Sequence, residues 1–173
     1  MDTVDPTRRS ANMSKVRSKD TGPELLVRSI AHRMGLRFRL YRRDMPGTPD
    51  LVFPRYKLAV FVHGCFWHRH PCCIRATTPS TRQEFWEKKF AATVERDARQ
   101  TRALEDLGWR VLVLWECGLK DQAALRATLA RAVEDADATT RRISHLGTLP
   151  PRGYRPSRTT PASRPTSRRQ WGC

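Results

Sequence analysis

Apolar and polar residues alternate in short segments through the first half of the chain, as they do in β-strands. Residues 36–41 alternate apolar side chains with Arg, and two short apolar runs follow at 51–53 and 56–62. A further apolar run spans 109–115. Period-two alternation is typical of half-buried strands, and short apolar runs bounded by turn residues are typical of buried ones. The pattern therefore predicts a strand at each of these segments.

Apolar residues with helical spacing flank the predicted strands. Thr21 and Glu24, with a Pro between them, form a typical helix start, and the stripe that follows ends before the next Gly. A longer stripe occupies 81–108, and Asp121 opens a last helix that continues to about Asp135. The order helix, three strands, long helix, strand, helix predicts an α/β fold, or a related α+β arrangement, with one central sheet.

Composition divides the chain of 173 residues into three parts. Residues 1–20 are polar and basic, with too few apolar side chains for a core, and are interpreted as an N-terminal arm. Residues 138–173 contain many Arg, Pro, Ser and Thr residues and no acidic ones, which predicts a disordered basic tail. The tail is either a non-specific phosphate-binding segment or a solvated appendage. Residues 21–137 remain as one folded domain.

The net charge of +16 and the pI near 10.9 are extreme for a soluble domain. The basic residues are spread along the whole chain rather than placed beside an apolar anchor, so nucleic acid is the expected partner. Charge alone does not separate ribosomal-type RNA binding, DNA binding and simple solubility.

Residues 63–73 concentrate Cys and His in a way that neither an ordinary core strand nor a surface loop requires. Thiolate and neutral imidazole are the ligands that Zn²⁺ prefers, and three Cys with one His is a common closed set. Cys73 is an alternative to Cys72 as the third thiolate, because spacing alone does not show which of these two adjacent residues would bind. The expected ligands are Cys65, His70, Cys72 and Cys117.

Two other interpretations of these cysteines are buried free thiols and disulfides. Residues 1–5 do not resemble a signal peptide, and the first apolar run is too short to span a membrane. We therefore expect a reducing, cytoplasmic, nucleoid-associated location and no membrane partner. A reducing compartment favours metal over disulfide.

Asp50 begins a predicted strand and lies about a dozen residues before Val62, where a later predicted strand ends. A hairpin between these strands brings Asp50 and Val62 close together. The Asp50 carboxylate and the Val62 backbone carbonyl are therefore candidate ligands of Mg²⁺, which prefers oxygen and leaves its other positions to water and phosphate. That arrangement suits phosphodiester hydrolysis. The alternative is that Asp50 only caps a turn.

His63 and His68 lie outside the expected zinc set, so either is a candidate general acid or base near neutral pH. Alternatively, each is a zinc ligand or hydrogen-bonds one. Phe66 and Trp67, together with Trp86 in the next helix, are either core aromatics or wedges that enter a base step of distorted duplex DNA.

Several motifs together resemble the very short patch repair (Vsr) endonuclease family, and the resemblance covers roughly Arg9 to Gly118. The combination of HGCFWH with WRVLxxWEC is far more specific than a lone Pro-Asp or a lone pair of Cys. The matching segments are 45–53, 60–70, 85–86, 94–97 and 108–117.

The resemblance implies a restriction-endonuclease-like core with a central mixed sheet flanked by helices and a structural zinc. It implies a Mg²⁺-dependent DNA mismatch endonuclease that nicks one strand immediately 5′ of the T in a T:G mispair, the product of 5-methylcytosine deamination. Duplex DNA with such a mispair is then the expected partner, together with other DNA repair proteins, and we expect a monomer.

Carried over by position, Asp50 and the Val62 carbonyl resemble the Mg²⁺ ligands of the family, and His68 its catalytic histidine. His63 and Glu24 resemble supporting active-site groups. The four expected zinc ligands resemble the structural zinc set, and the three aromatic residues resemble those that wedge open DNA beside the mismatch. The competing hypothesis is a non-catalytic, zinc-stapled nucleic-acid-binding module.

Two departures from the family pattern concern the site. Val62 stands where a relative has Thr, which removes any role for a hydroxyl but keeps the carbonyl. The 62–64 segment lacks the carboxylate and Lys that many related nucleases have there, so a His has to replace the Lys. The basic tail has no counterpart that the resemblance explains.

Overall fold

The computed structural model describes residues 5, 7–8 and 19–145. The 3₁₀ turns η1 (Pro54–Tyr56) and η2 (Glu116–Lys120) follow strands β2 (Leu51–Phe53) and β4 (Arg110–Trp115). The predicted order of helix, three strands, long helix, strand and helix is confirmed. The helices and strands are α2 (Gly22–Arg33), β1 (Arg39–Leu40), β2 (Leu51–Phe53), β3 (Leu58–His63), α3 (Gln83–Asp106), β4 (Arg110–Trp115) and α4 (Gln122–His145).

One mixed sheet of four strands has the order β1-β2-β3-β4. The first three strands form an antiparallel meander, in which Leu51 lies opposite Val60. Strand β4 runs parallel to β3, with Val62 opposite Leu114. A parallel neighbour needs a crossover, and the long α3 provides it. The expected central mixed sheet is present, and β3 lies in its interior, between β2 and β4.

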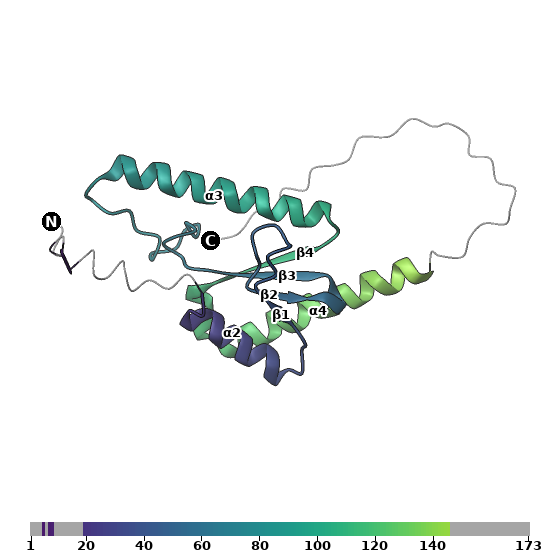
Figure 1. Cartoon of the computed structure of the whole chain (residues 1–173). Coiled ribbons are helices and arrows are strands. Elements are labelled where there is room, and N and C mark those ends of the chain that lie inside the picture. Colours follow the sequence, from purple (N-terminus) through teal and green to yellow (C-terminus); the bar gives the residue numbers. More distant parts are fainter. Residues whose placement is uncertain (1–4, 6, 9–18, 146–173) are drawn as a thin grey trace, which may run out of the picture.

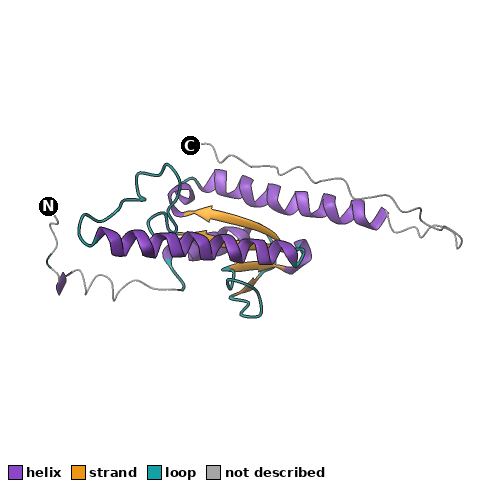
Figure 2. Cartoon of the chain, turned by 90° about the horizontal axis from the view of Figure 1, so that it is seen from above, coloured by secondary structure: helices purple, strands orange, loops and turns teal. Residues whose placement is uncertain are grey.

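Both faces of the sheet are covered, so the molecule has three layers (Figure 1). On one face, Leu51 and Val60 pack with α2 and α4 around Ile30 and Leu129. Seen from above, α3 lies across the opposite face (Figure 2). Successive strand residues point to opposite faces, which is why β2 and residues 58–62 of β3 are apolar throughout. The residues of the α3-side core are Met45, Val52, Ala59, Phe61 and Leu104, with Trp109 and Val111 packed against them.

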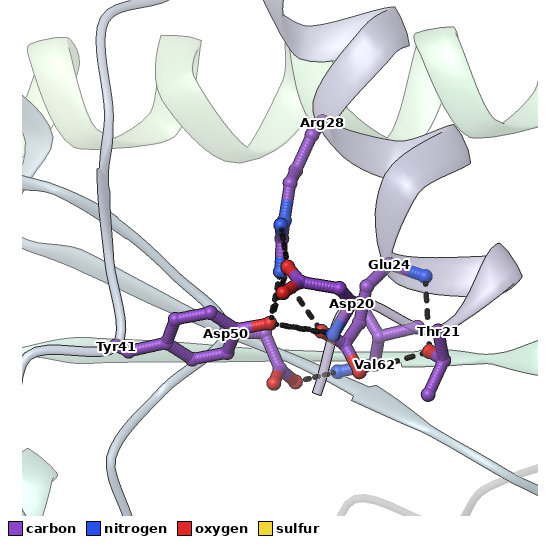
Figure 3. Close-up of polar contacts among 7 residues, drawn as sticks. All are labelled: Asp20, Thr21, Glu24, Arg28, Tyr41, Asp50 and Val62. Carbon is purple, nitrogen blue, oxygen red and sulfur yellow. Dashed lines mark hydrogen bonds and ion pairs between the residues drawn. The ribbon is translucent and has the colours of Figure 1, made fainter. Parts of the chain in front are cut away.

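Helix α2 starts as its sequence predicts. Thr21 is the N-cap, its hydroxyl accepts a hydrogen bond from the backbone N–H of Glu24 at 3.5 Å, and a Pro occupies the first turn. The chain after α2 turns at Gly35 with φ +73°, a left-handed conformation that Gly adopts without strain. The N-cap contact with Thr21 fixes Glu24, in the first turn, on the side of α2 that faces the start of β2 (Figure 3).

Two element boundaries differ from the prediction. The strand expected over 36–41 is confined to the two residues of β1, and Tyr41, whose φ of +48° leaves the extended conformation, ends it. Helix α4 continues ten residues beyond the expected end at Asp135, so 138–145 is helical rather than disordered. Extending a helix that is already anchored by packing costs little compared with nucleating one.

The other expectations about the ends concern 1–20 and 138–173, and they lie mostly outside the described residues. Among the helices that the structure describes, none is long and apolar enough to cross a membrane.

Candidate active site and metal-type cluster

A cavity of about 800 Å³ opens where the first residues of α2, the start of β2, the end of β3 and one face of α3 meet. Each of these elements contributes polar side chains to it. Expected site residues in its lining are Glu24, Asp50, Val62, His63, Trp67 and His68. The structure therefore brings together the groups for which chemistry was expected.

Asp50 enters the cavity just before β2, and its Oδ2 accepts a hydrogen bond from the Val62 backbone N–H at 2.8 Å (Figure 3). The hairpin contact predicted between these two residues is present. Burial raises the pKa of Asp50 to about 6, and the nearby Glu24 carboxylate adds to this, while the Val62 hydrogen bond and the Arg28 and His68 side chains oppose it. Two carboxylates in one cavity repel each other, and a cation between them relieves that repulsion.

Glu24 is almost completely buried, with 5% of its surface exposed, yet it carries hydrogen bonds on both oxygens. Oε1 accepts a hydrogen bond from the Thr21 hydroxyl at 2.8 Å. Oε2 accepts from the Asp20 backbone N–H, from Arg28 and from the Tyr41 hydroxyl (Figure 3). The surrounding donors stabilise a carboxylate that would otherwise be costly to bury.

His68 pairs with Asp97, which lies on α3. The distance from His68 Nδ1 to Asp97 Oδ2 is 2.5 Å. Although burial disfavours the charged carboxylate, hydrogen bonds from His68 and Arg96 hold the pKa of Asp97 below its ordinary value. An ionised carboxylate only accepts hydrogen bonds, so Nδ1 is the donor and Nε2 remains free to exchange a proton.

His63 stacks on His68, with ring centroids 3.7 Å apart and an angle of 11° between the planes. Burial and the neighbouring His68 lower the pKa of His63 to about 3. His63 is therefore neutral near pH 7, and His68 is the imidazole of the pair that contacts Asp97. His63, His68 and Asp97 offer ligand or proton-transfer atoms that all lie within 4.8 Å of one another.

A separate cluster lies beyond the end of β3, where the loop after it meets the start of η2. The His70 Nδ1 atom is 3.7 Å from Cys65 Sγ and 3.3 Å from Cys117 Sγ. A tetrahedral ion bonded at about 2.3 Å to sulfur and about 2.1 Å to nitrogen separates such atoms by about 3.6 Å. The cluster therefore has dimensions that fit zinc. Its four members are Cys65, His70, Cys73 and Cys117.

In the structure Cys73, rather than the expected Cys72, supplies the third sulfur of this cluster. Cys72 has φ +55°, and this left-handed turn directs the following Sγ toward the cluster. Burial raises the pKa of the Cys65 thiol to about 12 when no cation is present. A bound cation is what would stabilise the thiolate there.

The three expected wedge aromatics are half-buried and contact one another. Phe66 lies 5.0 Å from Trp67 and 5.6 Å from Trp86, measured between ring centroids. Phe66 also contacts the buried Phe90, which anchors the group on α3. Trp67 is the member of this trio that lines the cavity. The aromatic group is thus attached to the core on one side and adjoins the site on the other.

Sequence reasoning did not single out Asp97. It also did not single out Arg28 and Tyr41, the two side chains that donate hydrogen bonds to Glu24 Oε2. A signal for Asp97 was present, since Lys89, Thr93, Asp97 and Gln100 share one face of α3 at helical spacing, and all line the cavity. Arg96 and Lys19 add positive charge to the same lining. A basic lining around paired acids suits an anionic substrate.

Comparisons with known proteins give a consistent result. The sequence model of the family described as DNA mismatch endonuclease Vsr matches residues 1–74. The chain is 50% identical over 133 residues to the type II nicking enzyme V.XorIIP of Xanthomonas oryzae pv. oryzae, covering 77% of this chain and 97% of the relative.

Two further relatives are similar over most of their length. The DNA mismatch endonuclease Vsr of Escherichia coli strain K12 is 43% identical over 124 residues, 72% of this chain and 79% of the relative. The type II nicking enzyme V.NmeAIP of Neisseria meningitidis is 40% identical over 129 residues, 75% of this chain and 91% of the relative.

Proposed function

The chain belongs to the Vsr family of DNA mismatch endonucleases, and from this premise we propose that it nicks one strand of duplex DNA immediately 5′ of the T in a T:G mispair. Mg²⁺ is the proposed catalytic ion, and 5-methylcytosine deamination is the proposed source of the mispair. The observation that carries this is the cavity that joins two carboxylates, Asp50 and Glu24, to the His68–Asp97 pair.

Asp50 and the Val62 carbonyl would hold Mg²⁺, with water and a DNA phosphate in its other positions. When bound, the ion would orient the attacking water and neutralise charge that develops on the phosphate. Asp50 suits this role because it is buried, its Oδ2 is fixed by the Val62 N–H, and the adjoining Glu24 carboxylate disfavours its charged form without a cation.

His68 is the proposed general acid or base. Asp97 holds Nδ1–H, so Nε2 is presented as the atom that takes a proton from water or returns one to the leaving oxygen. His63 packs flat against His68 and stays neutral, so it maintains the ring orientation without adding a positive charge. Glu24 is the proposed second acceptor for a water proton.

Zinc at Cys65, His70, Cys73 and Cys117 is proposed to be structural. Four protein ligands complete a tetrahedral shell and leave no open position for catalysis. The cluster would tie the loop that carries His68 to the end of β4, and in that way fix the catalytic histidine.

Duplex DNA containing a T:G mispair is the proposed partner. The basic lining residues Lys19, Lys89 and Arg96 would contact phosphates, and Phe66, Trp67 and Trp86 would fill a step opened beside the mispair. A wobble pair stacks less well than a Watson–Crick pair, so opening that step costs less. We further propose that the protein acts as a cytoplasmic monomer alongside other repair proteins.

A nicking assay tests the proposal. Labelled duplexes that differ only in carrying T:G, T:A or C:G at one position are incubated with the protein in Mg²⁺ or in EDTA, across varied flanking sequences. We expect a single nick, 5′ of the T, only with T:G and only with Mg²⁺. Binding of every duplex without any nick would instead support the non-catalytic nucleic-acid-binding module.

A further inference from the structure

Arg28 and Tyr41 converge on Glu24 from two different elements (Figure 3). Arg28 lies one turn after Glu24 on α2, and its guanidinium approaches Glu24 Oε2 at 2.8 Å and Asp20 Oδ1 at 2.5 Å. Tyr41 follows β1, and its hydroxyl lies 2.7 Å from the same Oε2. The Arg28 side chain is only 11% exposed, so its ion pair with Glu24 is shielded from solvent.

The donors are divided unequally between the two oxygens of Glu24. Oε2 is approached by the Asp20 N–H at 3.1 Å, by Arg28 and by the Tyr41 hydroxyl. Oε1 accepts, from the described residues, a hydrogen bond from the Thr21 hydroxyl at 2.8 Å. A carboxylate oxygen has about two lone-pair sites. Oε2 is therefore saturated, whereas Oε1 retains a site for one more donor.

Tyr41 is held in place and kept protonated. The centre of the Arg28 guanidinium lies 4.9 Å from the Tyr41 ring centroid, and the Tyr41 hydroxyl accepts a hydrogen bond from the Asp20 N–H at 2.8 Å. Burial, together with the hydrogen bond to Glu24, raises the pKa of Tyr41 to about 12. The φ of +48° at Tyr41 is unusual for a bulky residue, and such backbone strain persists where surrounding contacts over-determine it.

We propose that Arg28 and Tyr41 are positioning residues for strand nicking: they occupy Oε2 of Glu24 and leave Oε1 as the oxygen that accepts a hydrogen bond from the attacking water in the cavity. This inference rests on the proposed endonuclease function. Neither residue is proposed to touch the DNA phosphate, and both act through Glu24. Their effect on the reaction therefore depends on Glu24 being present.

A double-mutant cycle separates this role from a merely structural one. Glu24→Gln keeps an oxygen for the three donors but can place an NH₂ group where Oε1 accepts. Tyr41→Phe removes the hydroxyl and keeps the ring beside Arg28. The rate is the single-turnover nicking rate of a T:G duplex in Mg²⁺, with duplex Kd and Tm measured on the same samples. Tyr56→Phe, on η1 outside the cavity lining, is the matched control.

We expect Tyr41→Phe to lower the nicking rate about tenfold, since a hydrogen bond to a charged group is lost. The same change in the Glu24→Gln background should lower the rate less than twofold, because the oxygen that Tyr41 helps to orient is gone. Kd should stay within about twofold in every variant, and Tyr56→Phe should nick at the normal rate. Arg28→Lys should restore part of the rate that Arg28→Gln loses.

Three results overturn the inference while leaving the proposed function intact: Tyr41→Phe at the normal rate, Glu24→Gln at the normal rate, or equal losses from Tyr41→Phe in both backgrounds. The last of these would mean that Tyr41 acts independently of Glu24. A wild-type protein that does not nick T:G duplex in Mg²⁺ would instead remove the proposed function, and the inference with it.

Discussion

Two polar clusters lie at the ends of β3 and β4 and differ in chemistry. The Cys65–His70–Cys73–Cys117 cluster offers three sulfurs and one nitrogen, closely spaced, with Cys65 completely buried. The Glu24–Asp50–His63–His68–Asp97 group offers oxygen and nitrogen atoms around an open cavity. Soft, closed ligand sets suit structural zinc, whereas hard, open ones suit Mg²⁺, water and phosphate.

The loop after β3 joins the two clusters, because it carries Cys65, His68, His70 and Cys73 within nine residues. Rigid ligands on either side of His68 limit where that ring can lie. The comparison suggests a division of labour in which one cluster holds the loop and the other performs the reaction.

The largest expected effect is on the sulfur-rich cluster. Cys73→Ser should abolish zinc binding and lower Tm by about 10 °C or more, since loss of a metal is among the most destabilising single changes. Cys72→Ser, the adjacent control, should keep one zinc per chain. Metal analysis and thermal melts check both. Zinc loss in Cys72→Ser alone would return the third thiolate to Cys72.

The next largest expected effect comes from His68, in the Glu24–Asp50–His63–His68–Asp97 group. His68→Ala should lower the T:G nicking rate about 10³-fold, because proton transfer by a positioned side chain contributes about 10²–10⁴. Zinc content should not change. His32→Ala, on α2 and outside the cavity lining, is the control and should nick normally. An active His68→Ala protein would mean that another group transfers the proton.

The third expected effect concerns Trp67, which is proposed to contact DNA. Trp67→Ala should reduce T:G nicking about 10- to 100-fold, since stacking on a base is worth about 1–3 kcal/mol. Tm should change little, because the ring contacts of Trp67 are with Phe66 and Trp86, which are themselves half-buried. Trp109→Ala should show the reverse pattern, because Trp109 packs against the buried α3-side core. A destabilised Trp67→Ala protein that nicks normally when folded would make Trp67 a core residue.

The smallest expected effect is the pH dependence contributed by His63. Its pKa falls from 6.5 to about 3 in the folded state, so between these values the unfolded chain binds more protons and stability falls as pH falls. From pH 7 to 5.5 the loss is about 1 kcal/mol. Denaturant unfolding at both pH values should show this loss in the wild type and a smaller one in His63→Asn. Equal losses would show that His63 is not a buried neutral imidazole.

Much of the fold follows from the sequence because its cause is local. The apolar runs of β2 and β3 report burial on both faces, and Thr21 caps α2 through its own hydroxyl. The two element boundaries that differ from the prediction depend on tertiary structure. Helix α4 packs on the core through Leu125 and Leu129 and continues past Asp135, and the left-handed Tyr41 ends β1 early.

The candidate site divides in the same way. Motif spacing predicts that Asp50, His63 and His68 are site residues, and the structure places them in one cavity. Spacing did not separate Cys72 from Cys73, because the direction of adjacent side chains depends on a turn whose dihedral angles the residue types do not determine. Asp97 contacts His68 across 29 positions, and Tyr41 contacts Glu24 across 17. Such pairings are fixed only by the assembled sheet and helices.

The most direct test compares Asp50→Asn with Asp44→Asn, whose carboxylate pairs with Arg42 on the surface and lies outside the cavity lining. The T:G nicking rate in Mg²⁺, the Kd for the same duplex and the zinc content are measured on both proteins. We expect Asp50→Asn to lose about 10³-fold in rate while binding DNA at least as tightly and keeping its zinc, and Asp44→Asn to match the wild type. Asp50→Asn nicking at the wild-type rate would contradict the assignment of catalysis to the open cavity.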